Sequence, residues 1–244
     1  MLVVSGWPTK AAGTVRESER GESVDVPKEP ATRGDDGLRL CRGIPEGAEQ
    51  QVAALYWEAF GRKLGSALGP PDKGRAFLAA HLHHDRGIAV LDGTGRVVGV
   101  AGYDLAGRGL TGGSARDVLS AYGPLGGLPR LALLALFTRK PAERELVMDG
   151  ICVAAPHRGT GIGSLLLREI AAVAAEHART RIRLDVIDVN PRARALYTRH
   201  GFTAVRTQRT PFLRTLMGFG AVTTMHRAVT PDGPGGGNPL CPTP

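Results

Sequence analysis

The segment that decides the fold reads ELVMDGICV over residues 145–153, AAPHRGTGIG over 154–163 and SLLLREI over 164–170. An apolar run typical of a strand leads into a turn with three glycines, and a helix with a spaced apolar face follows. Glycines at 159, 161 and 163 permit left-handed backbone angles and close approach of a ligand. Free N–H groups at the helix start, added to the positive end of the helix dipole, predict a pyrophosphate-binding turn.

Two common phosphate-binding motifs do not fit this turn. A P-loop needs Lys-Ser or Lys-Thr after its glycines, and no such pair follows here. The glycines also fall as G-x-G-x-G, whereas the dinucleotide fingerprint is G-x-G-x-x-G. Taken alone, the turn favours a phosphate site but is also compatible with a tight connection that binds nothing.

A second motif downstream removes that ambiguity. The first motif is Val153-x-x-x-x-Arg158-Gly-x-Gly161-x-Gly163 followed by Leu165-Leu166, and the second is Asn190-x-x-Ala193-x-x-Leu196-Tyr197-x-x-x-Gly201-Phe202. Together, and with one strand expected between them, they resemble the two hallmark motifs of the GNAT superfamily of N-acyltransferases. The resemblance covers about residues 39–229 and is specific over 145–202. It implies a mixed, mostly antiparallel α/β sheet flanked by helices, with acetyl-CoA as cosubstrate.

The resemblance also implies roles for individual residues. The pantetheine arm would pair with the backbone of Ile151, Cys152 and Val153, and the Val153 N–H would polarise the thioester carbonyl. Asn190 would hold the pantetheine or a bridging water, and Tyr197 would protonate the leaving thiolate, although Tyr197 is also compatible with simple helix packing. The pyrophosphate would meet the backbone of Arg158, Gly159, Thr160, Gly161, Ile162, Gly163 and Ser164, with a further contact from the Arg158 side chain.

Candidates for the general base and for the acceptor site come from the residues themselves. Asp149 lies four residues before Val153, so the period of two predicts that both side chains share one face of the strand; Glu145 has the same parity. Either carboxylate could take a proton through water, or could simply be solvated or salt-bridged. In the segment 56–60, Trp57 and Glu58 are the candidates for contact with a cationic amine.

The rest of the chain predicts one domain with two tails. Residues 1–37 and 230–244 are rich in charged residues, or in Gly and Pro, and we expect them to be flexible. Between them, residues 38–229 predict strands at 38–42, 88–91, 97–101, 145–153, 181–189, 202–206 and 221–227. Helices are expected at 46–61, from Asp72, at 114–121, 128–137, 161–177 and 191–199. The Gly-rich insertion 104–127 is ambiguous: it either shapes the acceptor pocket or supports a dimer contact.

Composition limits the alternatives. The formal net charge of +8 is compatible with binding of nucleic acid, an anionic surface or coenzyme A, but no basic stripe with interleaved aromatics indicates nucleic acid. Three scattered cysteines predict neither a disulfide framework nor a zinc ribbon, and the His81–Asp85 cluster lacks a second ligand group, so we expect no metal. The N-terminus has no signal peptide and no run is long enough to span a membrane, so we expect a cytoplasmic protein.

Three classes of function remain. The first is an N-acetyltransferase acting by direct attack on a primary amine of a small molecule or peptide, including an antibiotic or a peptide natural product. The second is a protein N-terminal or lysyl acetyltransferase, and the third is a non-catalytic acyl-CoA-binding or nucleic-acid-binding module. Tyr197 favours catalysis. A homodimer is a candidate assembly, and neither nucleic acid nor membrane is an expected partner.

Overall fold

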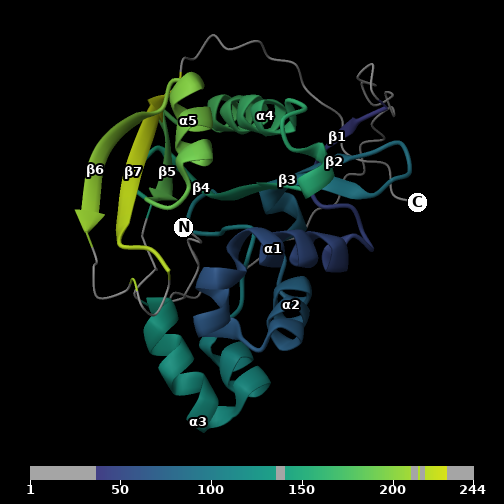
Figure 1. Cartoon of the computed structure of the whole chain (residues 1–244), viewed down its shortest axis with the longest axis vertical. Coiled ribbons are helices and arrows are strands. Elements are labelled where there is room, and N and C mark those ends of the chain that lie inside the picture. The colour runs from purple at the N-terminus through teal and green to yellow at the C-terminus, as the bar shows by residue number, and fades with distance from the viewer. Residues whose placement is uncertain (1–36, 136–140, 210–213, 215–217, 230–244) are drawn as a thin grey trace, which may run out of the picture.

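A single mixed sheet of seven strands organises the chain (Figure 1). The computed structural model describes residues 37–135, 141–209, 214 and 218–229. The strand order is β1-β2-β3-β4-β5-β7-β6, and every neighbouring pair is antiparallel except β4 and β5. The strands are β1 (Arg39–Arg42), β2 (Gly87–Leu91), β3 (Val97–Asp104), β4 (Glu145–Val153), β5 (Arg181–Ile187), β6 (Thr203–Arg209) and β7 (Ala221–Ala228). The predicted fold class is confirmed.

Helices cover the sheet on both sides and create two cores. Figure 1 shows α4 and α5 on one side, and α1 and α2 on the other, with α3 beyond them. One core, with Val52, Phe77 and Val100, lies on the α1 side. The other, with Leu166 and Phe202, lies under α4 and α5. The helices are α1 (Glu49–Leu68), α2 (Pro71–Ala80), α3 (Ala115–Ala135), α4 (Ile162–Glu176) and α5 (Pro191–Arg199), with short 3-10 turns at His84–Arg86 and Ala155–His157.

Local signals placed most element boundaries within a few residues. Strand β4 and helix α5 have the predicted bounds, and α5 begins as expected because Asn190 Oδ1 accepts from Ala193 N–H at 3.1 Å while Pro191 fills the first helical position. The prediction was wrong for Asp72, which lies in the first turn of α2 and is not its cap. In the insertion, the two predicted helices are present within the span labelled α3 and meet at Gly123, which has non-helical backbone angles with φ of +70°; the second of them begins before residue 128, earlier than predicted.

A β-bulge in β4 changes which residues share a face of the sheet. Gly102 of β3 pairs with Gly150, and Tyr103 pairs with Met148, so Asp149 is left out of the ladder. Met148 therefore faces the α4 core, as Val153 does, although the two differ in parity. The prediction that Asp149 and Val153 share a face is wrong, because the extra residue reverses the alternation between them. Asp149 instead faces the α1 side.

The two parallel strands separate directly before the bulge. Pairing of β4 with β5 covers only Glu145–Arg181, Leu146–Ile182 and Val147–Arg183, while β4 continues to pair with β3 as far as Val153. From Met148 onward, the edge of β4 that faces β5 is without a strand partner among the described residues. The sheet thus contains an open edge in its interior.

Three sequence expectations concern the ends and surfaces of the chain. The first strand begins at Arg39 and the last ends at Ala228, while the tails predicted at 1–37 and 230–244 lie outside the described residues except for Gly37. Among the described cysteines, Cys152 is a buried free thiol. None of the helices in the described part of the chain combines the length and apolar character that a membrane crossing requires.

Candidate active site

The open edge of β4 presents backbone groups that can pair with an extended ligand. Ala154 N–H donates to Val98 O at 2.9 Å, so Ala154 points toward β3. Because successive residues of a strand point their backbone groups to opposite edges, those of Val153 and Ile151 point to the open edge. Strand addition to an exposed edge is a common mode of ligand binding. Both are among the three residues predicted for pantetheine; the third, Cys152, directs its backbone groups to Val100 of β3 instead.

The turn after β4 ends in a row of N–H groups without protein partners. Gly159 and Gly161 have φ of +90° and +91°, and a Cβ at either position would meet no atom within 4 Å. Within the described residues, the backbone N–H groups of residues 159–164 donate to no protein acceptor, and the first N–H bond of the helix runs from Leu165 to Gly161 O. The helix dipole of α4 adds to this row. The turn therefore has the geometry of an anion site, although the N–H of Arg158, which was also predicted for it, donates to Ala155 O at 3.3 Å.

The first turn of α4 is fixed against α5. A Cβ at Gly163 would lie 3.1 Å from Leu196 Cδ2, so this glycine permits close helix packing. Ser164 Oγ lies 2.9 Å from His200 Nε2. Burial lowers the pKa of His200, and Arg227 lowers it further, which favours the neutral imidazole. The sequence analysis did not single out His200; its position directly before Gly201-Phe202 of the second motif was the available signal.

Three protonated side chains gather near the open edge. Burial raises the pKa of Tyr197 well above its ordinary value, and the Cys152 thiol raises it further. Burial also raises the pKa of Cys152. The pKa of Tyr56 is raised by burial and, to a smaller extent, by the nearby Cys152, Asp149 and Tyr197. Tyr197 therefore stays protonated and able to donate. Tyr56 was assigned to the core from sequence, but its buried hydroxyl has no hydrogen-bond partner in the described structure and belongs to this group.

Asp149, a predicted general base, is fully buried on the α1 side. Its Oδ2 accepts from Leu110 N–H at 2.6 Å. A Cβ at Gly109 would lie 2.4 Å from the same oxygen, so the insertion backbone packs directly on the carboxylate. This geometry makes Asp149 an anchor for the insertion.

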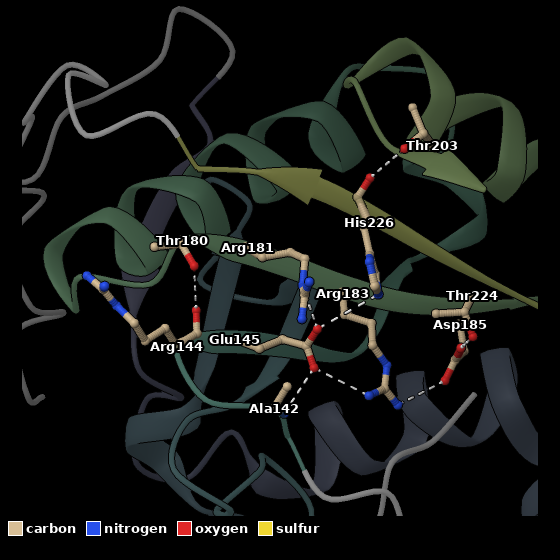
Figure 2. A network of polar contacts seen from close by, with 10 residues as sticks. All are labelled: Ala142, Arg144, Glu145, Thr180, Arg181, Arg183, Asp185, Thr203, Thr224 and His226. Atoms are coloured by element: carbon tan, nitrogen blue, oxygen red, sulfur yellow. Dashed lines mark hydrogen bonds and ion pairs between the residues drawn. The ribbon is translucent and has the colours of Figure 1, made fainter. Parts of the chain in front are cut away.

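Glu145, the other predicted base, is the centre of an ionic network (Figure 2). Its buried carboxylate lies 3.0 Å from Arg181 Nε and 3.4 Å from Arg183 Nη1, and it accepts from Ala142 N–H at 3.2 Å. Burial and Arg181 lower the pKa of the neighbouring His226. Glu145 also lies eight residues before Val153, roughly 26 Å along the strand. The network holds the paired end of β4 and β5, at a distance from the open edge.

The two predicted acceptor residues take different positions. Glu58 Oε1 on α1 accepts from Arg158 Nη2 at 2.7 Å, which brings it to the anion-binding turn. Trp57 packs between the helices: a Cβ at Gly74 of α2 would lie 2.2 Å from its ring. Trp57 thus belongs to the contact between α1 and α2, while Glu58 stays a predicted contact for a cationic amine substrate.

His81 and His83 contact an aromatic ring and a backbone carbonyl, respectively. His81 stacks on Phe77 with ring centroids 4.3 Å apart, and His83 Nδ1 lies 2.6 Å from Gly109 O. In the described ranges, no group of three or more His, Cys, Asp or Glu side chains gathers in a geometry that could hold a metal ion.

Comparison with known proteins shows a family for this chain. A model of the acetyltransferase (GNAT) family matches residues 50–202, which include α1, the open edge and the second motif. The thialysine N-epsilon-acetyltransferase of Bos taurus is 39% identical over 54 residues, which are 22% of this chain and 32% of that protein. The alignment thus spans about a third of the length of this curated relative.

Solved structures share the fold at low identity. A GCN5-related N-acetyltransferase from Kribbella flavida superposes with a TM-score of 0.53 at 18% identity, covering 80% of this chain and 99% of that one. A protein from Desulfovibrio desulfuricans assigned to the GNAT family gives 0.50 at 14% identity, over 79% and 99%. At these identities the likeness concerns the arrangement of strands and helices alone.

Proposed function

The chain belongs to the acetyltransferase (GNAT) family, and on that premise we propose that it transfers an acetyl group from acetyl-CoA to a primary amine of a small molecule or peptide. The observation that carries the proposal is the open edge of β4, which runs directly into the row of free N–H groups at residues 159–164. An extended arm that ends in a pyrophosphate matches these two features in order.

Binding of acetyl-CoA is assigned to the backbone. Ile151 and Val153 would pair with the amides of the pantetheine arm, and the N–H groups from Gly159 to Ser164 would bind the pyrophosphate. Asn190 Oδ1 is engaged as the cap of α5, which leaves its amide NH2 for the pantetheine or a water. The absence of a Cβ at Gly159 and Gly161 leaves room for the phosphates.

The transfer step requires stabilisation of negative charge and a proton for the leaving group. The amine nitrogen forms a bond to the thioester carbon, and the Val153 N–H stabilises the oxyanion. The C–S bond then breaks, Tyr197 gives its proton to the thiolate sulfur, and the amine loses one proton. The raised pKa of Tyr197 keeps this proton in place at neutral pH.

Two carboxylates, Asp149 and Glu145, are the predicted bases for the amine proton. The buried hydrogen bond of Asp149 and the ionic network of Glu145 support structural roles. Their assignment as bases stays a prediction, and transfer of the proton to water is the alternative. The bovine relative is named for acetylation at an N-epsilon position, which supports an amine as acceptor.

Calorimetric titration tests the proposal. We expect binding of acetyl-CoA and coenzyme A in the micromolar range and no binding of NAD, because the turn lacks the dinucleotide spacing. A panel of primary amines, assayed by release of free thiol, should then contain substrates. Lack of binding of both coenzyme A species by the folded protein would show that the turn is only a connection.

A further inference from the structure

The side chain of Arg158 links the anion-binding turn to α1. Its Nε donates to Val153 O at 3.0 Å, and its Nη2 donates to Glu58 Oε1 at 2.7 Å. Val153 O belongs to the open edge, so the guanidinium lies across the end of that edge. Arg158 thus contacts groups that we assign both to the acetyl donor and to the acceptor.

The ion pair between Arg158 and Glu58 is weak because both side chains are exposed to water. The side chains of Arg158 and Glu58 are 54% and 52% exposed, and exposed ion pairs are stabilised little because water screens them. Arg158 also immediately precedes the row of N–H groups at residues 159–164. A pyrophosphate there carries more charge than one carboxylate and accepts two parallel hydrogen bonds from a guanidinium. The phosphates therefore compete with Glu58 for the same side chain.

The carboxylate of Glu58 is placed where an acceptor would arrive. It contributes to raising the pKa of the Cys152 thiol, to which Arg158 contributes in the opposite sense, so both charges lie near the open edge. Cys152 faces the α1 core, on the side of the sheet opposite to α4. Because Arg158 bonds both Val153 O and Glu58 Oε1, the Glu58 carboxylate lies beside the end of the open edge, on the side of α1.

We propose that Arg158 exchanges partners during the reaction: its guanidinium leaves Glu58 for the pyrophosphate of acetyl-CoA, and the released Glu58 carboxylate binds the cationic acceptor. This inference rests on the proposed function. It makes the acceptor an amine that arrives as an ammonium ion, which gives one proton to water before its nitrogen attacks the thioester and loses the second when the amide forms. Because coupling between two ligands is reciprocal, a bound amine also strengthens the binding of coenzyme A.

The direction in which Glu58→Gln changes the affinity for coenzyme A tests the exchange, and this measurement does not depend on catalysis. In Glu58→Gln, Arg158 no longer has an ionic competitor, so coenzyme A should bind about two- to fivefold tighter, the range expected for loss of an exposed ion pair. The same variant should raise KM for the amine tenfold or more. In an Arg158→Gln background, Glu58→Gln should leave the affinity for coenzyme A unchanged, because the shared side chain is gone.

Glu176→Gln is the matched control. Glu176 forms an exposed ion pair with Arg42 at 2.6 Å, on α4 but away from the turn, and its loss should leave coenzyme A affinity unchanged. Unchanged or weaker binding of coenzyme A by Glu58→Gln would overturn the exchange, and would make the pair a brace for the turn. If the unmodified protein binds no coenzyme A, the proposed function itself fails, so the two failures are distinguishable.

Discussion

Replacement of Gly161 by Glu should abolish coenzyme binding with limited loss of stability. Gly161 has φ of +91° as the residue that begins α4, and a Cβ there meets no protein atom within 4 Å. The new side chain therefore fits the folded protein but extends into the space above the free N–H groups. Its carboxylate also carries the charge that these groups bind.

The loss of stability and the loss of binding can both be estimated. A left-handed conformation costs an L-residue about 1–2 kcal/mol, which is the expected loss in the free energy of unfolding. Hydrogen bonds to a charged group contribute about 1.5–3 kcal/mol each, so blocking two of the N–H groups removes at least about 3 kcal/mol of binding free energy. That loss is a more than hundredfold weaker affinity.

Gly95→Glu separates the two effects. Gly95 has φ of +83° in the turn between β2 and β3, and a Cβ there also meets no atom within 4 Å. Both variants should lose similar stability in urea unfolding, but only Gly161→Glu should lose binding in calorimetric titration with acetyl-CoA. An affinity for folded Gly161→Glu within about threefold of that of the unmodified protein would refute the assignment of this turn to the pyrophosphate.

Three further predictions concern single side chains. Tyr197→Phe should slow turnover by about 100-fold, the loss typical of a general acid, and change the binding free energy of acetyl-CoA by less than about 1 kcal/mol; equal rates would make Tyr197 a packing residue. Asp149→Asn should keep an oxygen that accepts from Leu110 N–H, so turnover should stay within about fivefold of that of the unmodified protein. Asp149→Ala removes this acceptor and should lower the free energy of unfolding by about 1–3 kcal/mol. A hundredfold slower Asp149→Asn enzyme with unchanged stability would instead support Asp149 as the general base. Burial and nearby arginines lower the pKa of His200, so the unfolded chain binds more protons below about pH 6.5 and stability falls with falling pH; His200→Asn should flatten this slope in urea unfolding between pH 7.5 and 5.

Residues close together in the sequence specified the part of the site that could be predicted. The strand, the glycine turn and the start of α4 follow one another within 20 residues, so apolar spacing and glycine chemistry were enough to predict these elements, while their assignment to coenzyme A needed the second motif. Helix α5 has its predicted bounds because Asn190 and Pro191 carry both the cap and the first-turn signal. The N–H groups at residues 159–164 belong to the backbone of this turn, and His200 of the second motif holds its last residue, Ser164.

Contacts between distant segments decided what the sequence could not show. Asp149 faces the α1 side because the pairing of β4 with β3 contains a bulge at this residue. The alternation of residues along one strand cannot predict such a bulge. The ionic network of Glu145 needs β5 and β7 beside it, with Arg181 and His226. Glu58 and Arg158 are separated by 100 residues, and only the packing of α1 on the sheet brings them together.

The bulge gives a physical reason for the position of the site. A bulge bends its strand and increases the local twist, and here pairing with β5 ends at Val147, two residues before Asp149. On its other edge β4 keeps its partner β3 up to Val153, so the open edge is held rigidly by the rest of the sheet. An unpaired edge is normally a risk for association with other chains, but this one lies inside the sheet between β3 and β5. An extended arm that pairs with Ile151 and Val153 at this edge would continue the ladder that β5 leaves at Val147, which is the role that we propose for pantetheine.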